Sequence, residues 1–184
     1  MSGYNFALAV HVIAIVAMFC CIAIVLVCMG GTRRAQTTQA MREWAKTGSM
    51  VAWALPVLAV IAYIPGGYMA SDHKYNKDAW VQVASVALVL MLIAFIVMAI
   101  RFRPLARATA TAPDGAVTVD LQRRALDPLL WLLAQAVSTL GVGVIILMTT
   151  KPGGGVSIIV FVVALVLGLL SAAPNFARLQ RLQA

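Results

Sequence analysis

The chain has 184 residues, of which 62% are hydrophobic and only 11% are charged, and its mean hydropathy is +0.95. A water-soluble domain of this length does not need so much apolar surface, so the composition indicates that a lipid bilayer surrounds most of the chain. The formal net charge is +8, but the basic residues are divided among short segments with no recognisable binding module, so nucleic acid is not an expected partner.

Five apolar stretches are long enough to cross a bilayer, because about 20 helical residues span its hydrocarbon core. A backbone in lipid must satisfy its own polar groups, and these stretches lack the alternation of barrel strands, so we expect helices. The sequence therefore predicts an all-α, polytopic bundle of five transmembrane helices in a single domain, residues 1–184. The expected spans are residues 6–29, 48–69, 79–100, 128–150 and 156–174.

The first span contains His11, and an ionisable side chain at membrane depth is a candidate functional residue by default. The second histidine, His73, lies in a short loop on the same side of the membrane. Together with Met69, Asp72 or Asp78 it could help His11 to ligate copper or a b-type haem. The favoured alternative is that His11 hydrogen-bonds a neighbouring helix and His73 is solvated, because no comparable ligand spacing is present.

The second span contains two potential helix breaks. Pro56 lies near its middle and should kink the helix, and Pro65-Gly66-Gly67 should end the helix or bend it again. Such breaks can line a binding site in transporters. The structural interpretation is favoured, because Pro is commoner in membrane helices than in soluble ones.

The connection after the third span, residues 101–127, is the longest polar segment. Thr and Val alternate on both sides of a Pro113-Asp114-Gly115 turn signal, which is compatible with a small hairpin or with a flexible connector. Asp127 and Pro128 then provide a capping residue and a first-turn proline for the fourth helix.

The fifth span has small residues at four-residue spacing, Ala164, Gly168 and Ala172. A face of this kind lets another helix approach closely. Its partner helix could belong to this chain or to another protein.

The basic residues near the span ends predict the orientation. Eleven of the fourteen lie in the first loop, the third loop and the C-terminal tail, and the other three are Lys74, Lys77 and Lys151. Cytoplasmic loops are enriched in Lys and Arg. We therefore expect the N-terminus outside, and loop 101–127 and the C-terminus in the cytoplasm.

Four features occur together: His11 in the first span, Gly30-Gly31 before a basic loop, Pro56 in the second span, and the sequence of residues 147–153 that ends the fourth. In combination they resemble an uncharacterised family of predicted bacterial integral membrane proteins, a domain of unknown function. Its members usually have four spans and a first-span histidine, and are loosely similar to the copper-resistance-D type. The likeness covers about residues 5–153, so the fifth span departs from it. It implies a helical bundle in a bacterial inner membrane with a histidine-centred site, but no activity.

Three functional hypotheses follow. The first is a non-enzymatic accessory or assembly subunit that packs against other membrane protein subunits, because the spans are uncharged, the loops are short and the fifth span has a small-residue face. The second is a haem- or copper-binding protein centred on His11. The third is a carrier for a small solute, with the broken second helix lining its path. An enzyme is not expected, because the sequence contains no recognisable catalytic arrangement.

Overall fold

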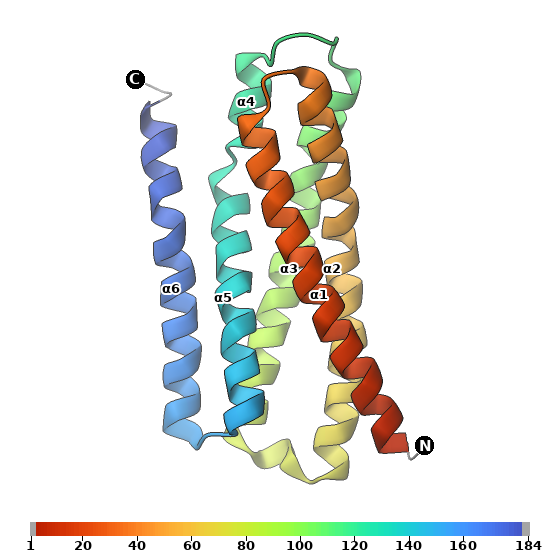
Figure 1. The fold of residues 1–184 in the computed structure, drawn as a ribbon. Coiled ribbons are helices and arrows are strands. Elements are labelled where there is room, and N and C mark those ends of the chain that lie inside the picture. The colour runs from red at the N-terminus through yellow and green to blue at the C-terminus, as the bar shows by residue number, and fades with distance from the viewer. Residues whose placement is uncertain (1–2, 182–184) are drawn as a thin grey trace.

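The structure is a computed structural model that describes residues 3–181, with side chains up to residue 173. Five long helices run up and down through the molecule, and a 3-10 turn and a short helix lie between them (Figure 1). The elements are α1 (Gly3–Arg34), α2 (Thr38–Asp72), η1 (Tyr75–Lys77), α3 (Ala79–Thr111), α4 (Val119–Ala125), α5 (Pro128–Thr150) and α6 (Gly154–Arg181).

The five long helices are each apolar enough to cross a membrane by length and composition, which confirms the predicted all-α bundle with five candidate spans. Successive long helices are antiparallel (Figure 1). The start of α1, the α2–α3 connection and the α5–α6 linker lie together at what we call the N-terminal end of the bundle. The α1–α2 turn, α4 and the last turns of α6 lie at the opposite end, called the α4 end.

The fourth span begins and ends as predicted. The Asp127 side chain accepts hydrogen bonds from the backbone N–H groups of Leu129 (2.9 Å) and Leu130 (3.3 Å), and Pro128 occupies the first turn. This capping satisfies two donors that a helix start leaves without partners.

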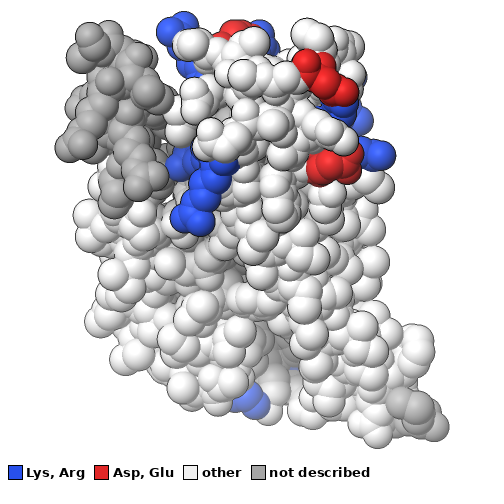
Figure 2. Space-filling model, turned by 45° about the horizontal axis from the view of Figure 1, so that its top comes forward, with Lys and Arg blue, Asp and Glu red and all other residues white. Residues whose placement is uncertain are grey.

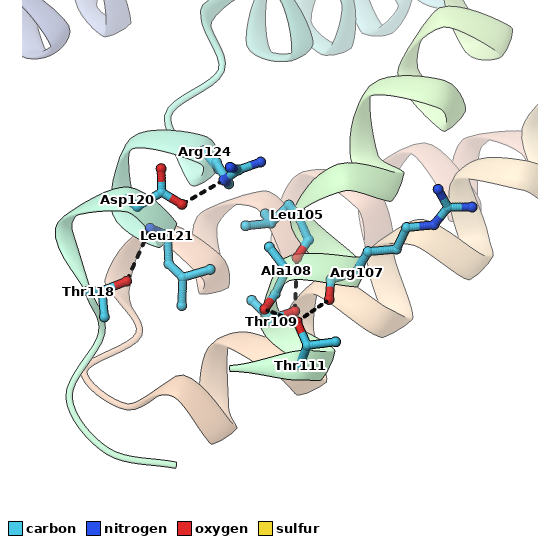
Figure 3. A network of polar contacts seen from close by, with 9 residues as sticks. All are labelled: Leu105, Arg107, Ala108, Thr109, Thr111, Thr118, Asp120, Leu121 and Arg124. Carbon is cyan, nitrogen blue, oxygen red and sulfur yellow. Dashed lines mark hydrogen bonds and ion pairs between the residues drawn. The ribbon is translucent and has the colours of Figure 1, made fainter. Parts of the chain in front are cut away.

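The hairpin considered for residues 106–120 is wrong. Residues up to Thr111 continue α3 and residues from Val119 form α4, so this segment is a helix, a turn and a helix. The Thr109 hydroxyl donates to the Leu105 carbonyl oxygen at 3.0 Å, and Thr118 caps α4 by accepting from the Leu121 N–H at 3.4 Å (Figure 3). Threonines that alternate in sequence are thus accommodated within a helix by backbone hydrogen bonds one turn back.

Arg42 fastens the start of α2 to the end of α3. Its Nε donates to the Thr109 carbonyl oxygen at 2.9 Å and its Nη2 to the Ala112 carbonyl oxygen at 2.8 Å, while Nη1 lies 3.0 Å from Asp114 Oδ1. The backbone N–H of Thr38 also donates to the Gly115 carbonyl oxygen at 2.9 Å. Two carbonyls at the end of α3, those of Thr109 and the cap residue Ala112, therefore have partners, and the start of α2 is tied to the end of α3. Basic and acidic side chains gather at this end (Figure 2).

Small residues set the closest helix contacts. A Cβ at Gly48 on α2 would lie 2.5 Å from the Phe102 ring of α3, and one at Gly31 on α1 would lie 2.4 Å from the Trp44 ring of α2. These glycines let large side chains pack directly on the backbone. The fully buried interior of α1, α2, α3 and α5 contains Val25, Leu55, Met91, Phe95, Phe102 and Val137.

The small-residue face of α6 packs against α5 of the same chain. A Cβ at Gly168 would lie 2.7 Å from the Ala136 Cα, and one at Gly143 of α5 would lie 2.9 Å from the Ala164 Cβ. Ala172 is also fully buried. The partner of this face is therefore inside the molecule, and the face is not available to a second protein.

α2 continues through both of its prolines. It runs without interruption from Thr38 to Asp72, so the expectation that Pro65-Gly66-Gly67 ends the helix is wrong. A bend at these residues and the kink at Pro56 stay predictions. α2 stays helical for two turns beyond Pro65. Gly66, within this part of the helix, lies against α1, where the candidate site is.

Candidate functional site

His11 of α1 contacts α2 at membrane depth. Its Nδ1 lies 2.6 Å from the carbonyl oxygen of Ala62. The ring rests on Gly66, where a Cβ would lie 2.9 Å from His11 Cε1 and 3.1 Å from Nδ1. The absence of a side chain at Gly66 therefore makes room for the imidazole, and the favoured sequence-based alternative, a hydrogen bond from His11 to a neighbouring helix, is confirmed.

This hydrogen bond fixes the tautomer of the imidazole. A carbonyl oxygen only accepts, so Nδ1 must carry the proton. In neutral His11 the lone pair therefore lies on Nε2, and no described side chain or backbone group is recorded as its partner. Metal-binding histidines commonly donate their other ring N–H to a backbone carbonyl in this way, which orients the ring.

His11 lines a cavity of about 1070 Å³. The volume is slightly above the usual range of about 300–1,000 Å³ for small-molecule and cofactor sites. α1, α2, α3 and α5 all contribute to its walls, and most of the lining side chains are apolar, including Leu8, Ile15, Met18, Leu88, Val144 and Met148. The cavity is thus large enough for a cofactor and is bounded by four of the five long helices.

The cavity ends toward the α4 end where α1 and α5 meet. A Cβ at Gly141 of α5 would lie 2.8 Å from the Phe19 ring of α1 and 3.7 Å from Met91 Cε of α3. Between this contact and the N-terminal end, residues of α1 and α5 face the cavity. Figure 1 shows the lower half of α1 diverging from α5 as it crosses in front of α2.

A row of rings crosses the N-terminal end of the cavity. Tyr4 is followed by His73 at 4.6 Å between ring centroids, then by Tyr75 at 5.6 Å and Trp80 at 5.7 Å. Lys151, from the α5–α6 linker, places Nζ 5.1 Å from the Tyr75 centroid and 5.7 Å from that of Trp80. Both distances suit cation–π contacts. Four segments of the chain are therefore joined across this end.

The structure does not gather the proposed ligand residues. His73 is exposed, does not line the cavity, and lies with Nδ1 3.6 Å from Asp72 Oδ2. Asp78 instead accepts from Trp80 Nε1 at 3.3 Å. Of the proposed set, only His11 and Met69 line the same cavity. In the part of the chain that the structure describes, no three His, Cys, Asp or Glu side chains form a group that could hold a metal ion.

Three contributors to this site were not identified from the sequence. The Ala62 carbonyl carries no sequence signal. Gly66 was noted as a helix break, whereas its role is to accommodate an imidazole, and a glycine inside an apolar helix near a histidine could have suggested this. Lys151 was used only to predict orientation, although it lies at the cavity.

Comparisons with protein-family models, with curated proteins and with solved structures find no match for this chain. The site therefore has to be interpreted from its own chemistry.

The adjacent glycines of α2 provide a matched test of the His11 contact. A Cβ at Gly66 would displace the imidazole, whereas one at Gly67 would meet nothing within 4 Å. We expect Gly66→Ala to have a free energy of unfolding about 1 kcal/mol lower than Gly67→Ala, the net value of one hydrogen bond. Dodecyl sulfate titration in mixed micelles, followed by circular dichroism, measures the difference. Equal stabilities of the two variants would show that the contact contributes nothing.

Proposed function

We propose that this protein binds a b-type haem in the cavity, with His11 Nε2 as a ligand of the iron. One observation carries the proposal: the hydrogen bond from His11 Nδ1 to the Ala62 carbonyl oxygen leaves the Nε2 lone pair available to a ligand beside a cofactor-sized apolar space. Haem supplies a one-electron redox centre, and the protein supplies the axial ligand and the surrounding polarity.

Haem fits these residues better than a bare copper ion does. The porphyrin provides four of the iron ligands, so a single histidine can hold it, as a proximal histidine does in globins. A bare copper ion has no porphyrin and must take its ligands from the protein or from water, and the described side chains offer no group of three His, Cys, Asp or Glu. Met69 and Met148 also line the cavity, and a thioether from either would be a suitable further ligand for the iron.

The accessory-subunit hypothesis has less support than the haem hypothesis. One observation in favour of an accessory subunit was the small-residue face of the fifth span, and α5 of the same chain covers that face. The outer surface of α6, with Ile159 and Leu170 more than half exposed, is the surface expected for lipid contact as much as for a protein partner.

The carrier hypothesis also has less support. A solute path requires a route through the bundle, and the cavity ends at the contact of Phe19 with Gly141. A binding cavity that extends from one end only is better suited to holding a ligand than to passing it across.

We further propose that the protein lies in a bacterial inner membrane with its N-terminal end outside. The eleven-to-three distribution of basic residues supports this orientation. The antiparallel order of the helices, which puts the three remaining lysines at one end of the bundle, is consistent with it (Figure 1).

The four lysines test the orientation directly. Lys46 lies near the α4 end, whereas Lys74, Lys77 and Lys151 lie at the N-terminal end. We expect a membrane-impermeant amine reagent to label Lys74 and Lys77 in intact cells, and Lys46 only after the membrane is opened. Peptide mass spectrometry reads out the modified sites. Labelling of Lys46 alone in intact cells would reverse the proposed orientation.

The two histidines provide a matched test of haem binding. Protein purified in mild detergent with haem supplied during expression should show a Soret band. His11→Ala should lower the haem content more than about tenfold, since loss of even an outer-shell partner costs that much in metal affinity. His73→Ala, which removes the histidine outside the cavity, should keep the haem content of the unmodified chain. A haemochrome assay measures the content.

A fold defect is distinguished from a lost ligand by two further measurements. Circular dichroism of His11→Ala should match that of the unmodified chain, and added imidazole should restore haem binding to His11→Gly. A haem-free unmodified protein with an intact helical fold, or equal haem in the His11 and His73 variants, would refute the proposal.

A further inference from the structure

A row of aromatic rings spans the N-terminal end of the cavity without sealing it from water. The row formed by Tyr4, His73, Tyr75 and Trp80 joins α1, the α2–α3 connection and α3, and Lys151 extends it to the α5–α6 linker. Trp80 is only 9% exposed although it lies next to a loop. Ser71, Asn76, Gln82 and Lys151 line the cavity beside this row and are exposed, so this end of the cavity is polar and open to water.

The side of the cavity between α1 and α5 is different. Leu8 and Val12 of α1 and Ile145 of α5 line the cavity and are each more than 40% exposed. These three residues define the portal, and Figure 2 shows the molecular surface hollowed near the lower edge of the molecule. All three are apolar and belong to helices that are long and apolar enough to cross a membrane. The portal therefore faces lipid, and only a molecule dissolved in the bilayer can reach it without crossing water.

Most of the polar side chains that line the cavity lie at one end. Lys151, Gln82, Asn76 and Ser71 line it near the aromatic row, whereas Met18, Phe19 and Met91 line the opposite end. Among the described residues that line the cavity, no Asp or Glu is present, and Lys151 and His11 are the only basic ones. This charge distribution favours a negatively charged group at Lys151 and an apolar body deeper in the membrane.

We infer that anionic amphiphiles dissolved in the bilayer enter the cavity through the portal and place their head group at Lys151. The ligand class is a molecule with a carboxylate or phosphate head group and an apolar body. Haem, whose two carboxylates lie on one edge of an apolar ring, belongs to this class. The inference rests on the proposed function because both use the same cavity. Its test contains no haem, so the inference and the proposed haem function can fail separately.

Trp80 is a built-in reporter of entry. A chain in which Trp80 is the only tryptophan, made by changing Trp44, Trp53 and Trp131 to Phe, is reconstituted into phosphatidylcholine vesicles. Two samples are compared, each with a minor fraction of brominated lipid. In one sample this lipid is phosphatidylglycerol, and in the other it is phosphatidylcholine. Both are brominated on the acyl chains near the glycerol. Bromine quenches tryptophan at short range, and Trp80 is buried from the lipids that surround the protein. Quenching of Trp80 therefore reports lipid inside the cavity.

We expect the anionic brominated lipid to quench Trp80 with about fivefold preference over the zwitterionic one, as expected for one lysine near a membrane surface. Lys151→Gln should abolish the preference. Filling the portal with Val12→Phe and Ile145→Phe should reduce quenching by both lipids. Trp53, 37% exposed on α2, serves as the only tryptophan in a control chain, and its quenching should not respond to these substitutions.

If the brominated lipids quench Trp53 in the control chain but do not quench Trp80 in its own chain, the inference of entry from lipid is overturned. Equal quenching by the two lipids, or a preference that survives Lys151→Gln, would overturn the role of Lys151. Each substitution is also made in the Trp53 control chain and measured in vesicles of the same composition, so a substitution that prevents folding is recognised by altered Trp53 emission. If the lipid test is positive but the unmodified chain fails the haem-binding test, this inference stays in place and the proposed haem function is refuted.

Discussion

The hydrogen bond between His11 Nδ1 and the Ala62 carbonyl oxygen, made over the bare backbone of Gly66, is the constraint on which the site depends. In lipid no water competes for either group, so a polar side chain at this depth is held wherever it finds an acceptor. The bond fixes the side of the ring that carries the proton, and hence the side available to a ligand. It also holds the first half of α1 against α2.

The cavity follows from that attachment. α1 is packed against α2 through Gly31 and meets α5 at Phe19, but between Phe19 and the N-terminus it stays with α2 and leaves α5. α3 forms a further wall of this space, and the aromatic row crosses its N-terminal end. α5 is kept in place from the other side by α6, whose small residues allow close contact. The contact between α5 and α6 therefore also fixes the position of α5, which forms one wall of the site.

The sequence was sufficient to predict the helices but not how they meet. Hydropathy identified all five long helices, and Asp127-Pro128 located the start of α5, because both signals are local. The extension of α3 to Thr111 was missed because charged residues were taken as the end of the helix, whereas the helix continues past them. His11 was recognised from its depth alone. Its partner was not, because a backbone carbonyl 51 residues away and the space above Gly66 depend on tertiary packing.

The protonation of the His11 ring tests this account most directly. The chain contains only two histidines, so nitrogen-15 magnetic resonance of histidine-labelled protein in lipid nanodiscs yields two sets of ring signals, and His73→Ala assigns them. The account predicts that neutral, ligand-free His11 exists as a single tautomer with the proton on Nδ1 and the lone pair on Nε2. A proton on Nε2, or the averaged signals of a ring that exchanges between tautomers, would contradict it.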